Sequence, residues 1–297
     1  MKIKSLLSEV GMEGMIDRMS GCVIYMGNPR ITLNSIISLR ASLPEIVLMH
    51  LFIISNGASN NDVNFITKAV DRLTSSTFVV KYINLPHNVG VITARNLGCE
   101  LMLADGSPYC LIFDNDLLFG KGWFKCSQQY MESLDLLGHD CGIVDFRKGN
   151  DWFHWFSKIR MGSGIFESMS IISYFYLIRL EVLRSGVKFD NYWTHRIGFT
   201  DQDSFGGTLE DTDFTLQAFH LGFRCGSGWI PIIHVGSQDR ILTKCGSRKN
   251  ELMQQRIQQK FANRWKDINL YYWETGIKGY LNIDFPLFVS WKSKEVI

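Results

Sequence analysis

The stretch YCLIFDNDLLF, residues 109–119, decides how this sequence is interpreted. An apolar run ends in two acids separated by one residue, Asp114 and Asp116, and apolar residues then resume. A short apolar run with this ending predicts a buried strand. Two carboxylates at the end of a buried strand suit a divalent cation and a phosphate-bearing ligand, because a hard cation prefers carboxylate oxygens and keeps positions open for phosphate. Two acids at this spacing are also common by chance, so the rest of the chain must support the interpretation.

Composition indicates a folded globular chain whose charge favours no particular partner. Of 297 residues, 46% are hydrophobic and 20% are charged, and the formal net charge is +2. A net charge this small gives no global attraction to nucleic acid, which is therefore not expected as a partner. The seven cysteines are scattered without a CxxC pair, so we expect reduced thiols rather than a disulfide framework or a zinc site.

No feature of the sequence indicates secretion or a membrane span. The first residues lack a long apolar segment, and no uncharged apolar run reaches 18 residues. We therefore expect a cytoplasmic protein. The aromatic run at 152–156 is a candidate for peripheral contact with a membrane, although such runs are more often buried or face a substrate.

The first half of the chain alternates predicted strands with predicted helices. Strands are expected at 22–26, 46–55, 77–83 and 109–113, and helices at 32–42, 63–73 and 91–104. This alternation implies βαβ crossovers and a mostly parallel sheet. In such sheets ligands bind outside the carboxyl ends of the strands. We therefore expect Asn28, Asn56, Asn88 and the Asp114–Asp116 turn to lie together, since each follows a predicted strand.

The second half is less regular but shows no linker, repeat or low-complexity segment. We expect a return to the sheet within 171–183, a helix at 210–221, a strand at 229–235 and a charged helix at 250–265. The chain is thus predicted to be one domain, 1–297. Within it, residues from about 20 to 120 would form the nucleotide-binding half, and 121–297 the acceptor-binding and catalytic half.

Three further patterns add residues that could carry chemistry. The motif NVGVITARNLG, residues 88–98, places Gly90 at a helix entrance, where the backbone can approach an anion closely, although an ordinary helix start would look similar. The motif GGTLEDTDF, residues 206–214, has acids in the first turn of a helix. A capping box explains part of this pattern, but three acids behind two glycines exceed what a cap needs. His234 at a strand end is more often structural, yet with two nearby acids it is a credible nitrogen ligand for a Mn²⁺-type metal.

The order of these motifs resembles that of GT-A fold, family-2-like glycosyltransferases. The matching segments, which span about residues 20–267, are SNGAS (55–59), NVGVITARNLG (88–98), DND (114–116), EDTD (210–213), His234 and RIQQKFANRWKD (256–267). There are two departures. Ser55 stands where the family commonly has a base-reading Asp, which leaves the donor base open, and the loop at 25–30 matches only loosely.

The resemblance implies an α/β fold of the GT-A, Rossmann-like type and a role for each matching residue. Asp116 and His234 would hold Mn²⁺ or Mg²⁺ on the diphosphate of a UDP-, GDP- or dTDP-linked sugar, with Asp114 on the metal or the ribose. Asp211, or alternatively Glu210, would deprotonate the hydroxyl of a saccharide, glycolipid or protein acceptor, which predicts inversion at the sugar. The residues expected to bind the donor are Asn56, Asn88, Gly90, Arg95, Asn96 and Asp114.

Two other classes of protein remain alternatives at this point. A phosphohydrolase with a nucleophilic Asp usually has Thr or Gly after its second acid, whereas Leu117 follows here. A non-catalytic carbohydrate-binding relative would not need the full set of Asp116, Asp211 and His234. A basic run at 240–249 is the only local sign of nucleic-acid binding.

Overall fold

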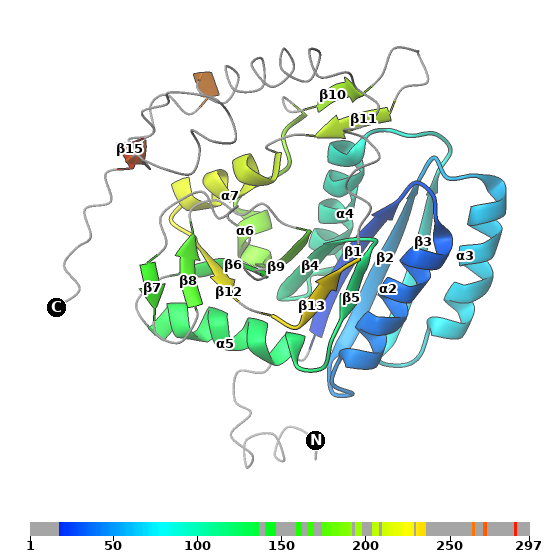
Figure 1. The fold of residues 1–297 in the computed structure, drawn as a ribbon, viewed down its shortest axis with the longest axis horizontal. Helices are drawn as coiled ribbons and strands as arrows, with labels where there is room; N and C mark the ends of the chain where they lie inside the picture. Colours follow the sequence, from blue (N-terminus) through cyan, green and yellow to red (C-terminus); the bar gives the residue numbers. More distant parts are fainter. Residues whose placement is uncertain are drawn as a thin grey trace.

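The first half of the chain forms the alternating strands and helices that the sequence predicts (Figure 1). The computed structural model describes residues 18–136, 140–146, 159–161, 165–168, 174–191, 194–197, 204–207, 210–228, 230–235, 263–264, 270–271 and 288–289. The elements of the first half are β1 (Arg18–Tyr25), α2 (Pro29–Ser42), β2 (Leu48–Asn56), α3 (Asn60–Leu73), β3 (Phe78–Leu85), α4 (Val91–Asp105), β4 (Tyr109–Asp114), β5 (Leu117–Phe119) and α5 (Trp123–Leu136). All seven elements predicted up to β4 are present, with ends shifted by a few residues.

In the part of the second half that the structure describes, short strands alternate with two short helices. These elements are β6 (Cys141–Phe146), β7 (Ile159–Met161), β8 (Ile165–Ser168), β9 (Phe175–Arg179), α6 (Leu180–Arg184), β10 (Thr194–Ile197), β11 (Ser204–Gly207), α7 (Glu210–His220), β12 (Arg224–Gly228), β13 (Ile232–His234), β14 (Leu270–Tyr271) and β15 (Phe288–Val289). The predicted helix at 210–221 is α7, and the expected return to the sheet is β9. The predicted strand at 229–235 is shorter than expected, and β12 was not predicted. The predicted helix at 250–265 lies outside the described residues except for 263–264, which are helical.

Nine strands form one mostly parallel sheet in the order β3-β2-β1-β4-β9-β6-β12-β8-β7. The ladders between β3, β2, β1 and β4 are parallel, and those on both sides of β9 are antiparallel. β8 also runs against its neighbours, so the other seven strands all point the same way. In the parallel ladders Tyr25 pairs with Ser55 and Ile24 pairs with Asp114, so these strands end at a common edge.

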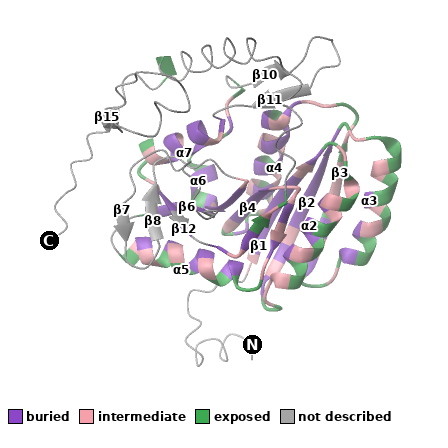
Figure 2. Ribbon diagram, in the orientation of Figure 1, coloured by how far each residue is buried: buried purple, intermediate pink, exposed green. Residues whose placement is uncertain are grey.

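Two apolar cores lie on opposite faces of this sheet because side chains alternate along each strand. Cys22, Ile54 and Ile112 face one core, which is covered by α4, α6 and α7. Val23, Ile53 and Phe113 face the other, which is covered by α2, α3 and α5. Figure 2 shows the central strands as buried and the outer surfaces of α2 and α3 as exposed. Both faces are covered, which is why the central strands read as continuous apolar runs.

Close packing fixes α4 against β1 and so fixes the direction of its side chains. A Cβ atom added to Gly98 of α4 would lie 2.4 Å from the sulfur of Cys22 on β1, so only glycine allows this approach. The six cysteines among the described residues are free, as the sequence predicts. Within the same described ranges, no helix is long and apolar enough to cross a membrane.

Candidate functional site

The loops after β2 and β3 are joined by a network of amide hydrogen bonds. Asn56 donates from Nδ2 to Oδ1 of Asn88 at 3.0 Å, and its own Oδ1 accepts from the Val89 backbone N–H at 2.8 Å. Oδ1 of Asn88 also accepts from the Gly90 backbone N–H at 2.8 Å. Three of the residues predicted to bind the donor, Asn56, Asn88 and Gly90, therefore lie together at the carboxyl edge of the sheet.

Gly57 makes this junction possible. Its φ of 75° is in the left-handed region, and a Cβ atom there would lie 2.4 Å from the backbone nitrogen of Asn88. A side chain at this position would be strained and would push the two loops apart. Helix α4 begins directly after this junction. Its N-cap residue, Gly90, has no side chain to cap the helix, so the first N–H groups of α4 are directed toward the same edge of the sheet.

Arg95 is a buried cation between two carboxylates. Its Nη2 lies 3.1 Å from Oδ1 of Asp114, and its Nη1 lies 3.1 Å from Oε1 of Glu210. Burial alone would lower the pKa of Arg95, but the two carboxylates outweigh that effect and raise it. Burial raises the pKa of Asp114, while Arg95 opposes that rise. Arg95 is among the residues expected to bind the donor, and that role stays a prediction. In the structure its guanidinium joins the end of β4 to the start of α7.

Asp211 follows Glu210 in the first turn of α7 and is partly exposed. Its Oδ1 accepts a hydrogen bond of 2.8 Å from the Thr212 backbone N–H. Burial, together with repulsion from Glu210, raises the pKa of Asp211 to about 7. A carboxylate with a pKa near neutrality can accept a proton and release it at physiological pH, as a general base must.

Asp116 and His234 face each other across a short antiparallel ladder. Oδ1 of Asp116 lies 3.2 Å from Nε2 of His234. The ladder pairs Leu117 of β5 with His234 of β13, and the Val235 backbone N–H donates to the carbonyl of Asp116 at 2.9 Å. The ring of Tyr174 stacks on that of His234, with centroids 3.9 Å apart, and so restrains the imidazole.

This pair fits a divalent metal. Oδ1 of Asp116 is buried, yet within the described part of the chain it accepts no hydrogen bond. A buried carboxylate oxygen without a donor, directed at an imidazole nitrogen, is a donor set that Mn²⁺ accepts. No group of three or more His, Cys, Asp and Glu side chains suited to a metal occurs among the described residues. Two protein ligands would leave most of the coordination sphere to water and the diphosphate of a bound nucleotide.

Two further asparagines have roles that the sequence pattern did not reveal. Asn96, which was expected to bind the donor, donates to the carbonyl of Phe189 at 2.6 Å and accepts from its N–H at 3.0 Å. Asn115, between the two acids, donates to Oγ1 of Thr32 at 3.0 Å and ties the turn to α2. Nothing in the sequence marks Tyr174, because it belongs to an apolar stretch in which no pattern distinguishes one aromatic residue. The aromatic run at 152–156 and the basic run at 240–249 lie outside the described residues.

Comparison with solved structures shows the same fold in several glycosyltransferases. The S. aureus TarS 1-349 fragment is 14% identical at a TM-score of 0.50, over 74% of this chain and 59% of that fragment. The mannosyltransferase PcManGT from Pyrobaculum calidifontis, solved with GDP-Man and Mn²⁺, is 11% identical at a TM-score of 0.56, over 91% of this chain and 69% of that one. GalNAc-T7, solved with UDP, GalNAc and Mn²⁺, is 11% identical at a TM-score of 0.54, over 73% of this chain and 43% of that one. The chain therefore spans 43% to 69% of these three solved chains.

Comparison at the level of sequence identifies the family. No protein of curated function matches the chain. The sequence model of glycosyl transferase family 2 matches residues 30–201, which is more than half of the chain and includes the loops after β2, β3 and β4. With the nine-stranded sheet and the order of its motifs, this match shows that the chain belongs to glycosyl transferase family 2 and has the GT-A fold.

Proposed function

We propose that the protein is a metal-dependent glycosyltransferase that moves a sugar from a nucleotide-diphosphate donor to a hydroxyl acceptor with inversion. The observation that carries this proposal is the double ion pair of Arg95, which holds the end of β4 next to the start of α7. A donor bound at the carboxyl edge of the sheet would thereby have a carboxylate with a pKa of about 7 close by. Such an arrangement suits the removal of a proton from an attacking hydroxyl.

The donor would bind along the edge formed by Asn56, Asn88 and Gly90. The neighbours support a nucleotide sugar, since TarS has been solved with UDP-GlcNAc and PcManGT with GDP-Man. The base is not assigned by these neighbours, because they hold different bases. Ser55, at the position where an Asp was expected to read the base, is fully buried at the end of β2. UDP-, GDP- and dTDP-linked sugars therefore all belong in a first screen.

Asp116 and His234 would hold Mn²⁺ or Mg²⁺ on the diphosphate. A bound divalent cation would neutralise the negative charge that develops as the nucleoside diphosphate leaves. Asp114 was expected on the metal or on the ribose. Its Oδ1 is paired with Arg95, and 36% of its side chain is exposed, so it can still contact the ribose of a bound donor.

Asp211 is the residue proposed as the general base. It would take the proton of the acceptor hydroxyl as that oxygen forms a bond to the anomeric carbon. The bond from that carbon to the diphosphate would break, with its electron pair leaving on the diphosphate. Attack from the side opposite the leaving group inverts the anomeric carbon. Glu210 is the weaker candidate because its carboxylate is already paired with Arg95. General-base catalysis typically raises the rate of such a reaction about 10²–10⁴-fold.

A thermal-shift screen of nucleoside diphosphates and their sugars, with and without Mn²⁺, tests the donor side of this proposal. A ligand that binds the folded state raises the melting temperature by mass action, so one nucleotide should stabilise the protein more when Mn²⁺ is present. Asp211→Asn should keep this shift and lose transfer to an acceptor. Asp71→Asn, at an exposed position of α3, is the matched control and should keep both.

Three results would contradict the proposal in different ways. Release of inorganic phosphate without transfer would indicate a phosphohydrolase. Binding of a free saccharide with no nucleotide response would indicate a carbohydrate-binding relative. Loss of nucleotide binding in Asp211→Asn would assign that residue to the structure of α7 rather than to catalysis.

A further inference from the structure

Two buried aromatic rings bring two acids from distant parts of the chain together. Phe189 and Phe214 stack with centroids 4.4 Å apart and planes 16° apart. Asp190 directly follows the first ring in sequence, and Asp213 directly precedes the second. Two nearby carboxylates repel each other, and a cation placed between them would relieve that repulsion.

Arg264 supplies that cation. Its Nη2 lies 2.9 Å from Oδ2 of Asp190, and its Nε lies 2.6 Å from Oδ1 of Asp213. The side chain of Asp213 is fully buried, whereas those of Asp190 and Arg264 are each 29% exposed. A guanidinium can donate to two carboxylates at once from its planar group, which a lysine ammonium does with less geometric control.

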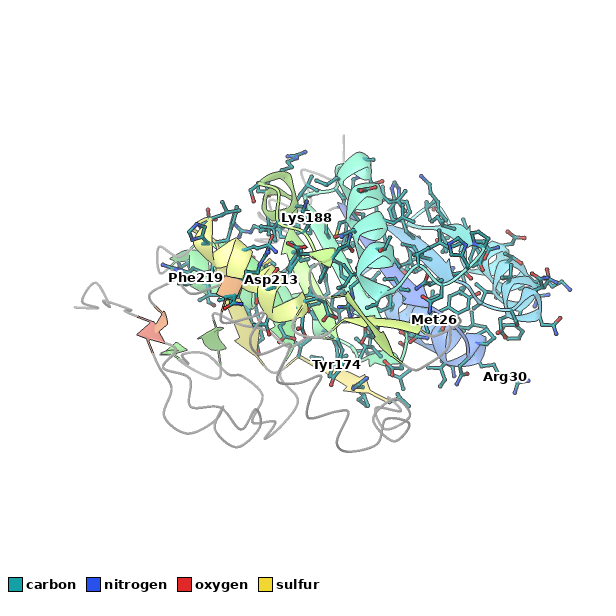
Figure 3. The ribbon with its side chains drawn as sticks, turned by 90° about the horizontal axis from the view of Figure 1, so that it is seen from above. Met26, Arg30, Tyr174, Lys188, Asp213 and Phe219 are labelled. Atoms are coloured by element: carbon teal, nitrogen blue, oxygen red, sulfur yellow. The ribbon has the colours of Figure 1, made fainter. Side chains whose placement is uncertain are left out.

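The segment that carries Phe189 is also held by carboxamides from two helices. Gln217 of α7 donates from Nε2 to the carbonyl of Lys188 at 3.0 Å and to Oδ2 of Asp213 at 2.7 Å, so Lys188 and Asp213 lie close together (Figure 3). Asn96 of α4 binds both backbone groups of Phe189. The segment thus connects α4, which carries Arg95, to α7, which carries the two acids of the candidate site.

This connection leads directly to the candidate site. The guanidinium carbon of Arg95 lies over the ring of Phe189, 5.3 Å from its centroid, in a cation–π contact. Arg95 in turn bonds to Glu210, the neighbour of Asp211. A shift of Phe189 away from Phe214 would therefore move both the cation and the first turn of α7.

We propose that Arg264 is a positioning residue for sugar transfer. By bridging Asp190 and Asp213 it fixes the first turn of α7, and with it Asp211, relative to Arg95 and the end of β4. The inference rests on the proposed function, because Arg264 would affect transfer only by placing Asp211, the proposed base, and would itself contact neither donor nor acceptor. Its effect on transfer comes entirely from the placement of the base.

The first test is Arg264→Met, with transfer and nucleotide binding measured separately. A displacement of about 1 Å can lower a catalytic rate about 100-fold, so we expect a loss of that order in kcat. The Mn²⁺-dependent thermal shift with the nucleotide should stay as large as in the unchanged protein. Arg184→Met is the matched control, since Arg184 is 58% exposed and should leave kcat within about 2-fold. An unchanged kcat in Arg264→Met, or a loss of nucleotide binding with it, would overturn the inference.

The second test uses a compensating change. If Arg264 acts by neutralising two neighbouring acids, removal of one charge should partly replace it. The double variant Arg264→Met/Asp190→Asn should therefore recover about 10-fold of the kcat lost in Arg264→Met, a gain that a side chain touching the acceptor would not show. Arg264→Lys keeps the positive charge but cannot donate to both carboxylates in the same planar geometry. Its kcat should therefore lie between those of Arg264→Met and the unchanged protein. Failure of both variants to restore transfer would reject the bridging role.

A third measurement does not depend on any enzymatic activity. Backbone amide exchange near the start of α7, at residues 212–215, should be at least about 10-fold faster in Arg264→Met. Exchange in the central strands β1 and β2 should be unchanged. If the unchanged protein transfers no sugar at all, the proposed function fails, while faster exchange confined to α7 would still support the bridge. Equal exchange in both proteins would show that Arg264 does not hold α7.

Discussion

Nη1 of Arg95 lies 3.1 Å from Oε1 of Glu210, although the two residues are 115 positions apart in the sequence. Arg95 stands on the second turn of α4, and Glu210 is the first residue of α7. The side chains are 8% and 11% exposed, so this ion pair is largely shielded from solvent. Helix α4 in the first half of the chain and helix α7 in the second half thus meet in a buried ion pair.

Arg95→Met should destabilise the protein strongly. Removing this cation leaves the carboxylates of both Asp114 and Glu210 uncompensated, at a loss of about 3 kcal/mol of unfolding free energy. For a chain of this size, the melting temperature should fall by roughly 6–12 °C. Arg184→Met, which changes an exposed arginine, should shift it by no more than about 2 °C. A melting temperature equal to that of the control would show that Arg95 contributes nothing to stability.

The rate of transfer should fall as the pH drops below about 7. Because the pKa of Asp211 is raised to about 7, the proposed base becomes protonated there and cannot accept the proton of the acceptor. A plot of log kcat/KM between pH 5 and 9 should rise with a slope near one on its acidic side and level off above about pH 7. An acidic limb near pH 4, the usual range of an Asp, would rule out a raised pKa at the base.

Asp211→Asn should make the protein more stable at alkaline pH. A carboxyl whose pKa is about 7 in the folded chain and 3.8 in the unfolded chain loses its proton more readily when unfolded. Ionisation therefore disfavours the folded state progressively from about pH 4 to pH 7, and by a constant amount above that. The variant should melt about 2–4 °C higher than the unchanged protein at pH 8, which corresponds to about 1 kcal/mol. At pH 4 the two should melt together, and a lower melting temperature at pH 8 would contradict the raised pKa of Asp211.

Asp116→Asn and His234→Gln should weaken the response to Mn²⁺. Each change removes one of the two protein ligands, so the affinity for Mn²⁺ in the presence of nucleotide should fall at least about 100-fold. The Mn²⁺ dependence of transfer, measured by titration after treatment with a chelator, reports this affinity. His220→Gln, at an exposed position on α7, is the control for the imidazole. Transfer that continues in Asp116→Asn without any metal would eliminate the metal site.

Gly57→Ala should disrupt the junction between the loops after β2 and β3. The added methyl group would lie 2.4 Å from the nitrogen of Asn88, at a φ that alanine rarely adopts. We expect a loss of about 1–3 kcal/mol in unfolding free energy and weaker binding of the nucleotide. Gly27→Ala is the matched control, because no atom lies within 4 Å of a Cβ added there. Equal nucleotide affinity in the two variants would remove this junction from the donor site.

The sequence predicted the first half of the fold well because its signals are local. Each central strand is buried on both faces and reads as an apolar run, as in Leu51–Ile54. Each turn carries residues with strong backbone preferences, such as Gly57 and Gly106. In the second half β12, Arg224–Gly228, contains two glycines and a serine, so neither hydrophobicity nor propensity marks it as a strand. It forms because β6 and β8 bind it on both sides, which no local pattern reveals.

The sequence predicted where the residues of the candidate site lie in the fold, but not which side chains contact each other. The rule that ligands bind at the carboxyl edge selected Asn56, Asn88 and Asp116, and the structure places each of them at or just past the end of a strand. It gave no information on which side chains bind each other. Arg95 reaches Glu210 and Asn96 reaches Phe189 because α4 packs closely on β1, and that packing depends on tertiary structure.

The ladder between β5 and β13 has a consequence for how quickly a product can leave. Each of these strands is three residues long, and they pair with each other outside the nine-stranded sheet. A ladder this short can open locally while the rest of the domain stays folded. Each opening would draw His234 away from Asp116 while the central sheet stays intact. We therefore expect the residence time of the spent nucleotide to follow the fraying of this small ladder, rather than the global stability of the protein.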